Sequence, residues 1–237
     1  RHADWGEADR LVTIYTREEG KIRAVAKGVR KMKSRKAGHL EPFTRVKLLL
    51  AKGHDLWIVT QAESVELYSP IRENLELTAL AAYVVELLDR FTYEEGANWQ
   101  LYKLLTETLD LLAVSEDTFV PIRYYEMRVL DILGFRPLLF KCASCDEEIQ
   151  PRDQFFSADA GGVLCPRCRG KGQSTRPVSL EALRYLRHFQ RSSYPRAAQA
   201  NPPEEVRLEM EGVMTYYLTY LLERGLNSPE FIKQIRR

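Results

Sequence analysis

The sequence has no apolar run of about eighteen residues, the minimum length for a membrane-spanning helix, and we expect no membrane span. It also has no glycine-rich phosphate loop, no P-loop and no G-x-S-x-G turn. Its four histidines, His2, His39, His54 and His188, show neither metal-ligand nor catalytic-triad spacing. The sequence therefore predicts a protein that is not an enzyme and has no small-molecule substrate.

Cysteine is also scarce, and all four cysteines fall in two tight pairs, Cys142 with Cys145 and Cys165 with Cys168. This C-x2-C-x19-C-x2-C spacing is typical of a structural zinc site, since each pair can reach one ion and four thiolates complete a tetrahedron. The segments 154–157 and 161–164 are expected to form two short strands that bring the pairs together. We predict one structural Zn²⁺ per chain, in a reducing compartment.

Three other interpretations of the cysteines remain. Two disulfides or a thioredoxin-like redox pair would also use paired cysteines, although a redox pair normally lies between a strand and a helix. A zinc deaminase signature is suggested by His39-Leu40-Glu41 together with Cys165 and Cys168, but Leu164 occupies the position where that signature has proline. The zinc deaminase interpretation also leaves the first cysteine pair without a role.

Charge is unevenly distributed along the chain. Residues 1–66 hold 14 Lys and Arg against 9 Asp and Glu, whereas the remainder holds 21 against 24. This asymmetry predicts that the N-terminal part meets an anionic partner.

The residues from Asp9 to about Glu66 alternate between apolar and polar side chains, as in a small antiparallel sheet or barrel. Four strands are expected, near residues 11–16, 21–27, 45–50 and 56–66. Residues before Asp9, together with an N-terminal piece that we expect to be missing because the chain begins at Arg1 rather than Met, would supply a fifth. Five strands would complete an OB-type barrel over residues 1–68.

Beyond Pro70 the apolar period changes to that of helices. Helices are expected over 74–91 and 97–114, from Phe119 to a cap at Gly134, from Ser179 to Phe189, from Pro202 to Gly225 and from Ser228, with a loop over 192–201. The predicted fold class is α+β with two domains: an N-terminal OB-fold β-barrel, then an α-helical domain over 69–141 and 171–237. The four-cysteine zinc module, 142–170, is inserted in the helical domain.

The segment Ala26–Lys36 places six cations at the end of one strand and in the following loop. Neighbouring strand faces also carry cations, so we interpret the surface as a nucleic-acid interface rather than a solvated loop. The predicted DNA-binding residues are Lys21, Arg23, Lys27, Arg30, Lys31, Lys33, Arg35, Lys36, Arg45 and Lys47. Tyr15 and Trp57 are candidates for base stacking, with packing in the core as the alternative.

Four segments, Gly6–Thr13, Thr16–Lys21, Ala26–Arg35 and Glu41–Phe43, together resemble the bacterial RecO family of recombination mediators. The resemblance implies a DNA repair and recombination protein of the RecF pathway, cytoplasmic and at the nucleoid. It also implies binding of single- and double-stranded DNA, strand annealing and, with RecR, loading of RecA onto DNA coated by single-stranded DNA-binding protein.

The resemblance also concerns particular residues. The basic segment from Lys27 to Lys36 would supply DNA contacts, and the helical domain would receive the C-terminal tail of the single-stranded DNA-binding protein. Asp146 stands where the family often has glycine, and aspartate tolerates the left-handed conformation that this position needs. An alternative function is a zinc-containing helical adaptor that binds proteins and contacts DNA incidentally.

Overall fold

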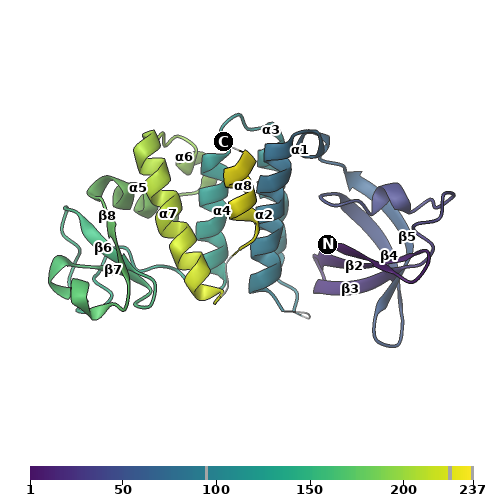
Figure 1. The fold of residues 1–237 in the computed structure, drawn as a ribbon, viewed down its shortest axis with the longest axis horizontal. Coiled ribbons are helices and arrows are strands. Elements are labelled where there is room, and N and C mark those ends of the chain that lie inside the picture. The colour runs from purple at the N-terminus through teal and green to yellow at the C-terminus, as the bar shows by residue number, and fades with distance from the viewer. Residues whose placement is uncertain (94–95, 224–225, 236–237) are drawn as a thin grey trace. The chain divides into compact units, whose positions relative to one another are not determined.

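The computed structural model describes residues 1–93, 96–223 and 226–235 (Figure 1). By internal contacts the chain divides into two compact units, Arg1–Val114 with Phe231–Arg237, and Ser115–Glu230. The sequence-based division into residues 1–68, 69–141 with 171–237, and 142–170 stays a prediction. In the described part of the chain, none of the helices combines the length and apolarity that a membrane crossing requires.

The first unit begins with a five-stranded sheet (Figure 1). Its strands pair in the order β1-β2-β3-β5-β4, antiparallel except for the parallel pair β3 and β5. The expected strand before Asp9 is confirmed as β1, and β1 and β4 form the edges of the sheet. A closed barrel stays a prediction. The strands are β1 (His2–Trp5), β2 (Asp9–Thr16), β3 (Gly20–Ala26), β4 (Arg45–Lys52) and β5 (Trp57–Glu66).

One face of this sheet packs into a core, as the alternation of apolar residues predicts. Val12 and Ala24 are direct partners across β2 and β3 and lie in the core. The loop after β3 adds Val29 and Leu40 to the same cluster. Residues from β4 and β5 pack against it, including Leu48 and Trp57.

The helices of the first unit follow the sheet along the chain. Asn74 accepts a hydrogen bond from the amide of Leu77 at 3.1 Å and caps the longest of them, as its sequence position favours. A short helix, α1, begins directly after the domain boundary predicted between residues 68 and 69. The elements are the 3-10 turn η1 (Ala37–His39) and the helices α1 (Ser69–Glu73), α2 (Leu75–Phe91), α3 (Trp99–Val114) and α8 (Ser228–Ile235), the last of which crosses the division between the units.

The second unit combines helices with a three-stranded sheet of order β7-β6-β8 (Figure 1). Gly134, with φ of +82°, follows the end of α4 (Phe119–Ile132) and caps it, as predicted. The loop expected over 192–201 contains a short helix, α6, so that prediction was wrong there. Gly225, the expected end of α7, lies outside the described residues. The elements are α4 (Phe119–Ile132), β6 (Gln154–Ser157), β7 (Gly162–Leu164), η2 (Pro166–Lys171), β8 (Thr175–Val178), α5 (Leu180–Arg191), α6 (Tyr194–Ala197) and α7 (Glu204–Leu221).

Candidate nucleic-acid interface and metal centre

The loop that follows β3, Lys27–Lys36, is called the basic loop below, and it is fixed to the sheet at its base. Gly28 adopts a φ of +64°, and its amide donates to the Asp9 carboxylate at 2.7 Å. The amide of Arg30 donates to the carbonyl of Ala8 at 2.9 Å. Val29, between them, is only 1% exposed in the core. The base of the loop is therefore ordered, and its cations extend from a fixed position.

The six cations of the basic loop differ in whether their charged groups interact with other groups of the protein. Lys27, Lys31, Lys33 and Arg35 are exposed. Arg30 forms an ion pair with Asp4 at 3.3 Å. The ammonium of Lys36 is part-buried and donates to the carbonyl of Val59 at 2.9 Å. The exposed members are the ones best placed to meet a polyanion.

The four predicted cations on the strands also divide into two kinds. Arg23 and Lys47 are exposed. Arg45 lies 4.0 Å from the carboxylate of Asp110 on α3. Lys21 donates to the backbone carbonyl of Asp89 at 2.7 Å and lies 3.2 Å from its carboxylate, at the end of α2. The Lys21 ammonium is thus held inside the first unit.

The two candidate stacking residues lie in different surroundings. Trp57 packs against the core cluster of the sheet. Tyr15 lines a cavity, and burial raises the pKa of its hydroxyl. Tyr15 therefore borders an open volume.

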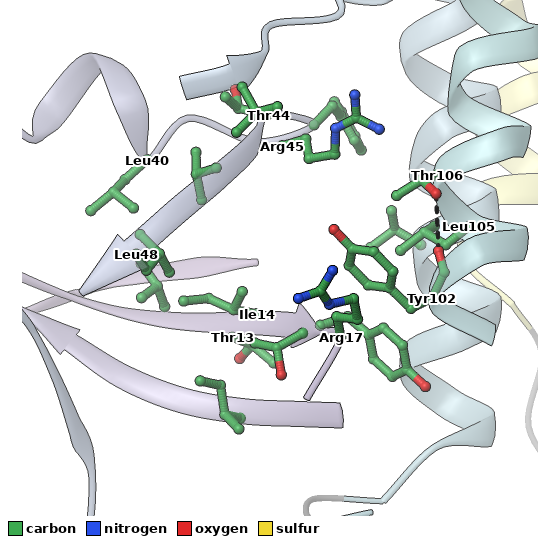
Figure 2. A pocket seen from close by; sticks show the side chains of 18 of the residues that line it. Thr13, Ile14, Arg17, Leu40, Thr44, Arg45, Leu48, Tyr102, Leu105 and Thr106 are labelled. Carbon is green, nitrogen blue, oxygen red and sulfur yellow. Dashed lines mark hydrogen bonds between the residues drawn. The ribbon is translucent and has the colours of Figure 1, made fainter. Parts of the chain in front are cut away.

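This cavity, called the sheet–α3 cavity below, has a volume of about 790 Å³ and lies within the first unit. Figure 2 shows Ile14 and Leu48 of the strands and Tyr102 and Leu105 of α3 around it. Thr44 also lines it. The sequence does not predict this cavity, because its walls come from segments that are far apart along the chain and carry no shared motif.

The four cysteines gather in the second unit. Their sulfur atoms all lie within 4.8 Å of one another, and the sulfurs of Cys145 and Cys165 are 3.9 Å apart. A tetrahedron with Zn–S bonds of about 2.3 Å has edges of about 3.8 Å, so the spacing fits a tetrathiolate metal site. All four are free cysteines. The clustering expected from the spacing is confirmed, as are β6 and β7 between the pairs.

Each cysteine pair sits in a tight turn. The amide of Asp146 donates to the carbonyl of Cys142 at 2.9 Å, and that of Cys168 donates to the carbonyl of Cys165 at 2.8 Å. Asp146 has a φ of +57°, which confirms the left-handed conformation predicted for it. The turns hold the two sulfurs of each pair within 4.8 Å of one another.

The electrostatics of the cluster favour a bound cation. Burial acts to raise the pKa of Cys142, but the amides of Cys165, Cys145 and Ser144 lower it to about 6. At Cys145 the amide of Glu147 acts to lower the pKa, but the neighbouring cysteine side chains raise it to about 12. Four crowded sulfurs cannot all carry negative charge without a cation between them. The residues present therefore fit Zn²⁺.

Fold and site together define a two-part α+β protein, in which a strand-rich N-terminal sheet carries a cationic loop and a helical part carries a four-cysteine cluster. Comparison with known protein families identifies the family within this class. The profile of "Recombination protein O N terminal" matches residues 1–68, and that of "Recombination protein O C terminal" matches residues 72–230. The chain belongs to the recombination protein O (RecO) family.

Individual relatives agree with this assignment. A DNA repair protein RecO from Roseiflexus sp. (strain RS-1) is 39% identical over 237 residues, covering all of this chain and 83% of the relative. Proteins of the same name from Pelotomaculum thermopropionicum and Dehalococcoides mccartyi (strain ATCC BAA-2266 / KCTC 15142 / 195) are 36% and 34% identical, over 98% and 94% of this chain and 90% and 88% of the relatives.

Proposed function

We propose that this protein acts in DNA repair and recombination by binding DNA through the basic loop and the adjoining strand face. Membership of the RecO family and the name DNA repair protein RecO carried by its relatives support the repair role. The observation that supports the mapped surface is the ordered loop base with exposed Lys27, Lys31, Lys33 and Arg35. Such a surface binds phosphates with little dependence on base identity.

The proposed contact set comprises the basic loop together with Arg23, Arg45 and Lys47. Lys21 is assigned a structural role instead, because its ammonium donates hydrogen bonds to the carbonyl and the carboxylate of Asp89 near the C-terminal end of α2. Single and double strands would both be bound, since each presents a line of phosphates.

The family resemblance supports a finer proposal. The protein would anneal complementary strands, act with RecR, receive the tail of the single-stranded DNA-binding protein and help RecA load onto coated DNA, at the nucleoid in the cytoplasm. No covalent step is required of it. One Zn²⁺ held by the four cysteines would cross-link the turns of residues 142–168 and stabilise the second unit rather than touch DNA.

A charge-reversal experiment tests the DNA interface. The variant Lys31→Glu, Lys33→Glu, Arg35→Glu alters three exposed cations whose side chains form no hydrogen bond or ion pair with the described residues. For single strands, log K falls with log salt by about 0.7 per phosphate contact, so the salt slope should decrease by about 2 and annealing should slow. Fluorescence anisotropy of a labelled single strand at several salt concentrations measures the slope.

A matched control makes the same charge change elsewhere. Arg72, Lys103 and Lys171 are exposed cations outside the proposed interface, and their joint replacement by glutamate should leave the slope near that of the wild-type protein. An equal loss in both variants would mean that only overall charge matters. Wild-type slope and annealing in the loop variant would reject the interface and favour the protein-binding adaptor.

A further inference from the structure

Helix α5, in the second unit, carries a row of arginines on its solvent side. Arg184, Arg187 and Arg191 follow one another at intervals of three and four residues and so share one face of the helix. Arg184 and Arg191 are exposed, and Arg187 is partly buried. The opposite face carries Leu186 and Phe189 into the core. The three cations, called the arginine stripe below, therefore run along the exposed side of α5.

The arginine stripe has no carboxylate that neutralises it. None of its three guanidiniums forms an ion pair with a residue that the structure describes. Arg187 donates instead to the carbonyl of Leu139 at 2.8 Å. The guanidinium carbons of Arg187 and Arg191 lie 5.0 and 3.4 Å from the ring centre of Phe140. Two like charges thus share one aromatic ring.

This arrangement costs stability in the free protein. Like charges four residues apart on a helix repel one another, and Arg187 and Arg191 are such a pair. Burial and then the charge of Arg191 lower the pKa of Arg187. The helix dipole favours cations in the last turn of a helix, so it does not account for Arg184 or Arg187. An anion bound along the stripe would offset the repulsion.

A hollow of about 530 Å³ continues the stripe beyond α5. Arg184 and His188 line it from α5, and Arg196 lines it from α6. Arg196 is exposed and, like the stripe, forms no ion pair with the described residues. Glu181 brings one carboxylate to the lining, against two guanidiniums. The hollow therefore has the room and the charge to accept a phosphate group.

The surface fits a strand of phosphates better than an acidic protein segment. Guanidiniums bind phosphate oxygens through paired hydrogen bonds. Protein partners are usually anchored by apolar side chains, but residues 180–200 carry no exposed large apolar side chain. Arg184 and Arg191 are separated by about 10 Å along the helix axis, a length that several phosphates of one strand span.

We propose that the arginine stripe and the adjoining hollow bind the phosphates of a second DNA strand, distinct from the strand held by the basic loop. Arg184, Arg191 and Arg196 would contact phosphate oxygens. The inference rests on the proposed function and adds to it a contact surface in the second unit. A chain with both surfaces holds two strands at once, as annealing requires.

Counting bound strands on the full chain tests the inference. The probe is an oligothymidylate of about six nucleotides, within the range of a single site. With excess probe at low salt, sedimentation should show two strands per wild-type chain. The variant Arg184→Glu, Arg191→Glu, Arg196→Glu should bind one. The binding step that it loses should have a salt slope of about 2, from three phosphate contacts of about 0.7 each.

Two other variants separate the inference from the proposed function. The basic-loop variant should also bind one strand, and the control variant with glutamate at residues 72, 103 and 171 should bind two. One strand per wild-type chain, or two per α5 variant chain, would overturn the inference, while a loss of binding in the loop variant still supported the proposed function. A loop variant that bound two strands would overturn both.

Arginine modification gives a readout that needs no substitution. Phenylglyoxal reacts with exposed guanidiniums, and bound oligothymidylate should slow its reaction with Arg184, Arg191 and Arg196 several-fold, as peptide mass spectrometry would show. Arg72, exposed and outside both surfaces, should stay reactive. Oligoglutamate of equal charge is the second probe. Protection of the three arginines by oligoglutamate but not by oligothymidylate would assign the surface to an acidic protein segment and overturn the inference.

Discussion

The ammonium of Lys21 connects β3 to the C-terminal end of α2, and replacing it with methionine should destabilise the first unit without weakening DNA binding. The ammonium donates to the carbonyls of Asp89 and Thr92 and lies 3.2 Å from the Asp89 carboxylate. The side chains of Lys21 and Asp89 are only 14% and 17% exposed, so solvent screens their attraction weakly. Methionine retains the apolar stem but loses every one of these contacts.

The magnitude follows from these contacts. Hydrogen bonds from a charged donor each contribute about 1.5–3 kcal/mol, and a cation at a helix C-terminus adds about 0.3–1 kcal/mol. These effects overlap at one ammonium, so Lys21→Met should lower the free energy of unfolding by about 2–4 kcal/mol. Lys27→Met, at an exposed lysine, should change it by less than about 0.5 kcal/mol.

Tryptophan fluorescence during urea unfolding is a specific assay for this prediction, because all three tryptophans, Trp5, Trp57 and Trp99, lie in the first unit. The salt slope for single-stranded DNA should decrease by about 0.7 in Lys27→Met and stay unchanged in Lys21→Met. If Lys21→Met unfolded at the wild-type urea concentration, or if it alone reduced the salt slope, the structural assignment of Lys21 would be refuted.

Two further predictions concern the metal cluster and an alkaline titration. Purified, reduced protein should contain about one zinc per chain, and Cys168→Ser or a chelator should lower the melting temperature of the second unit by about 10 °C, as followed by circular dichroism; metal analysis that found none would contradict the site. The Tyr68 hydroxyl is buried and donates to Asp110 at 2.8 Å, and burial first, then Asp110, raises its pKa above the ordinary value of about 10. Stability from the protonated hydroxyl is complete below pH 10 and lost as pH rises toward the raised pKa, so Tyr68→Phe should show a shallower decline above pH 10 in the fluorescence assay.

Local patterns were sufficient to predict the main elements. Alternation identified β2 to β5, and helical periodicity with a capping residue identified α2 and α5. The strand β8 was missed because it contains Pro177, which argues against a strand. As an edge strand beside β6, β8 has room for a residue without an amide proton. The parallel pairing of β3 with β5 joins segments that are far apart in the sequence, and the residue pattern of neither strand predicts it.

The candidate site was likewise predictable from the sequence only in part. Cysteine spacing predicted the cluster because the geometry of a two-residue turn is local. Which cations stay exposed was not predictable, since the partners of Lys21 and Lys36 come from other elements. The sheet–α3 cavity depends on Tyr15, Thr44 and Tyr102, which only the tertiary fold brings together.

The division of the chain has a consequence for the order in which it can fold during synthesis. The second unit is one continuous stretch, 115–230, whereas the first takes residues from both sides of it. The second unit can therefore reach its complete set of internal contacts while the first still lacks Ile232, which is 7% exposed in α8. A nascent chain would complete the contacts of its N-terminal unit last, and a fragment that ends at Val114 would lack the part of α8 that belongs to that unit.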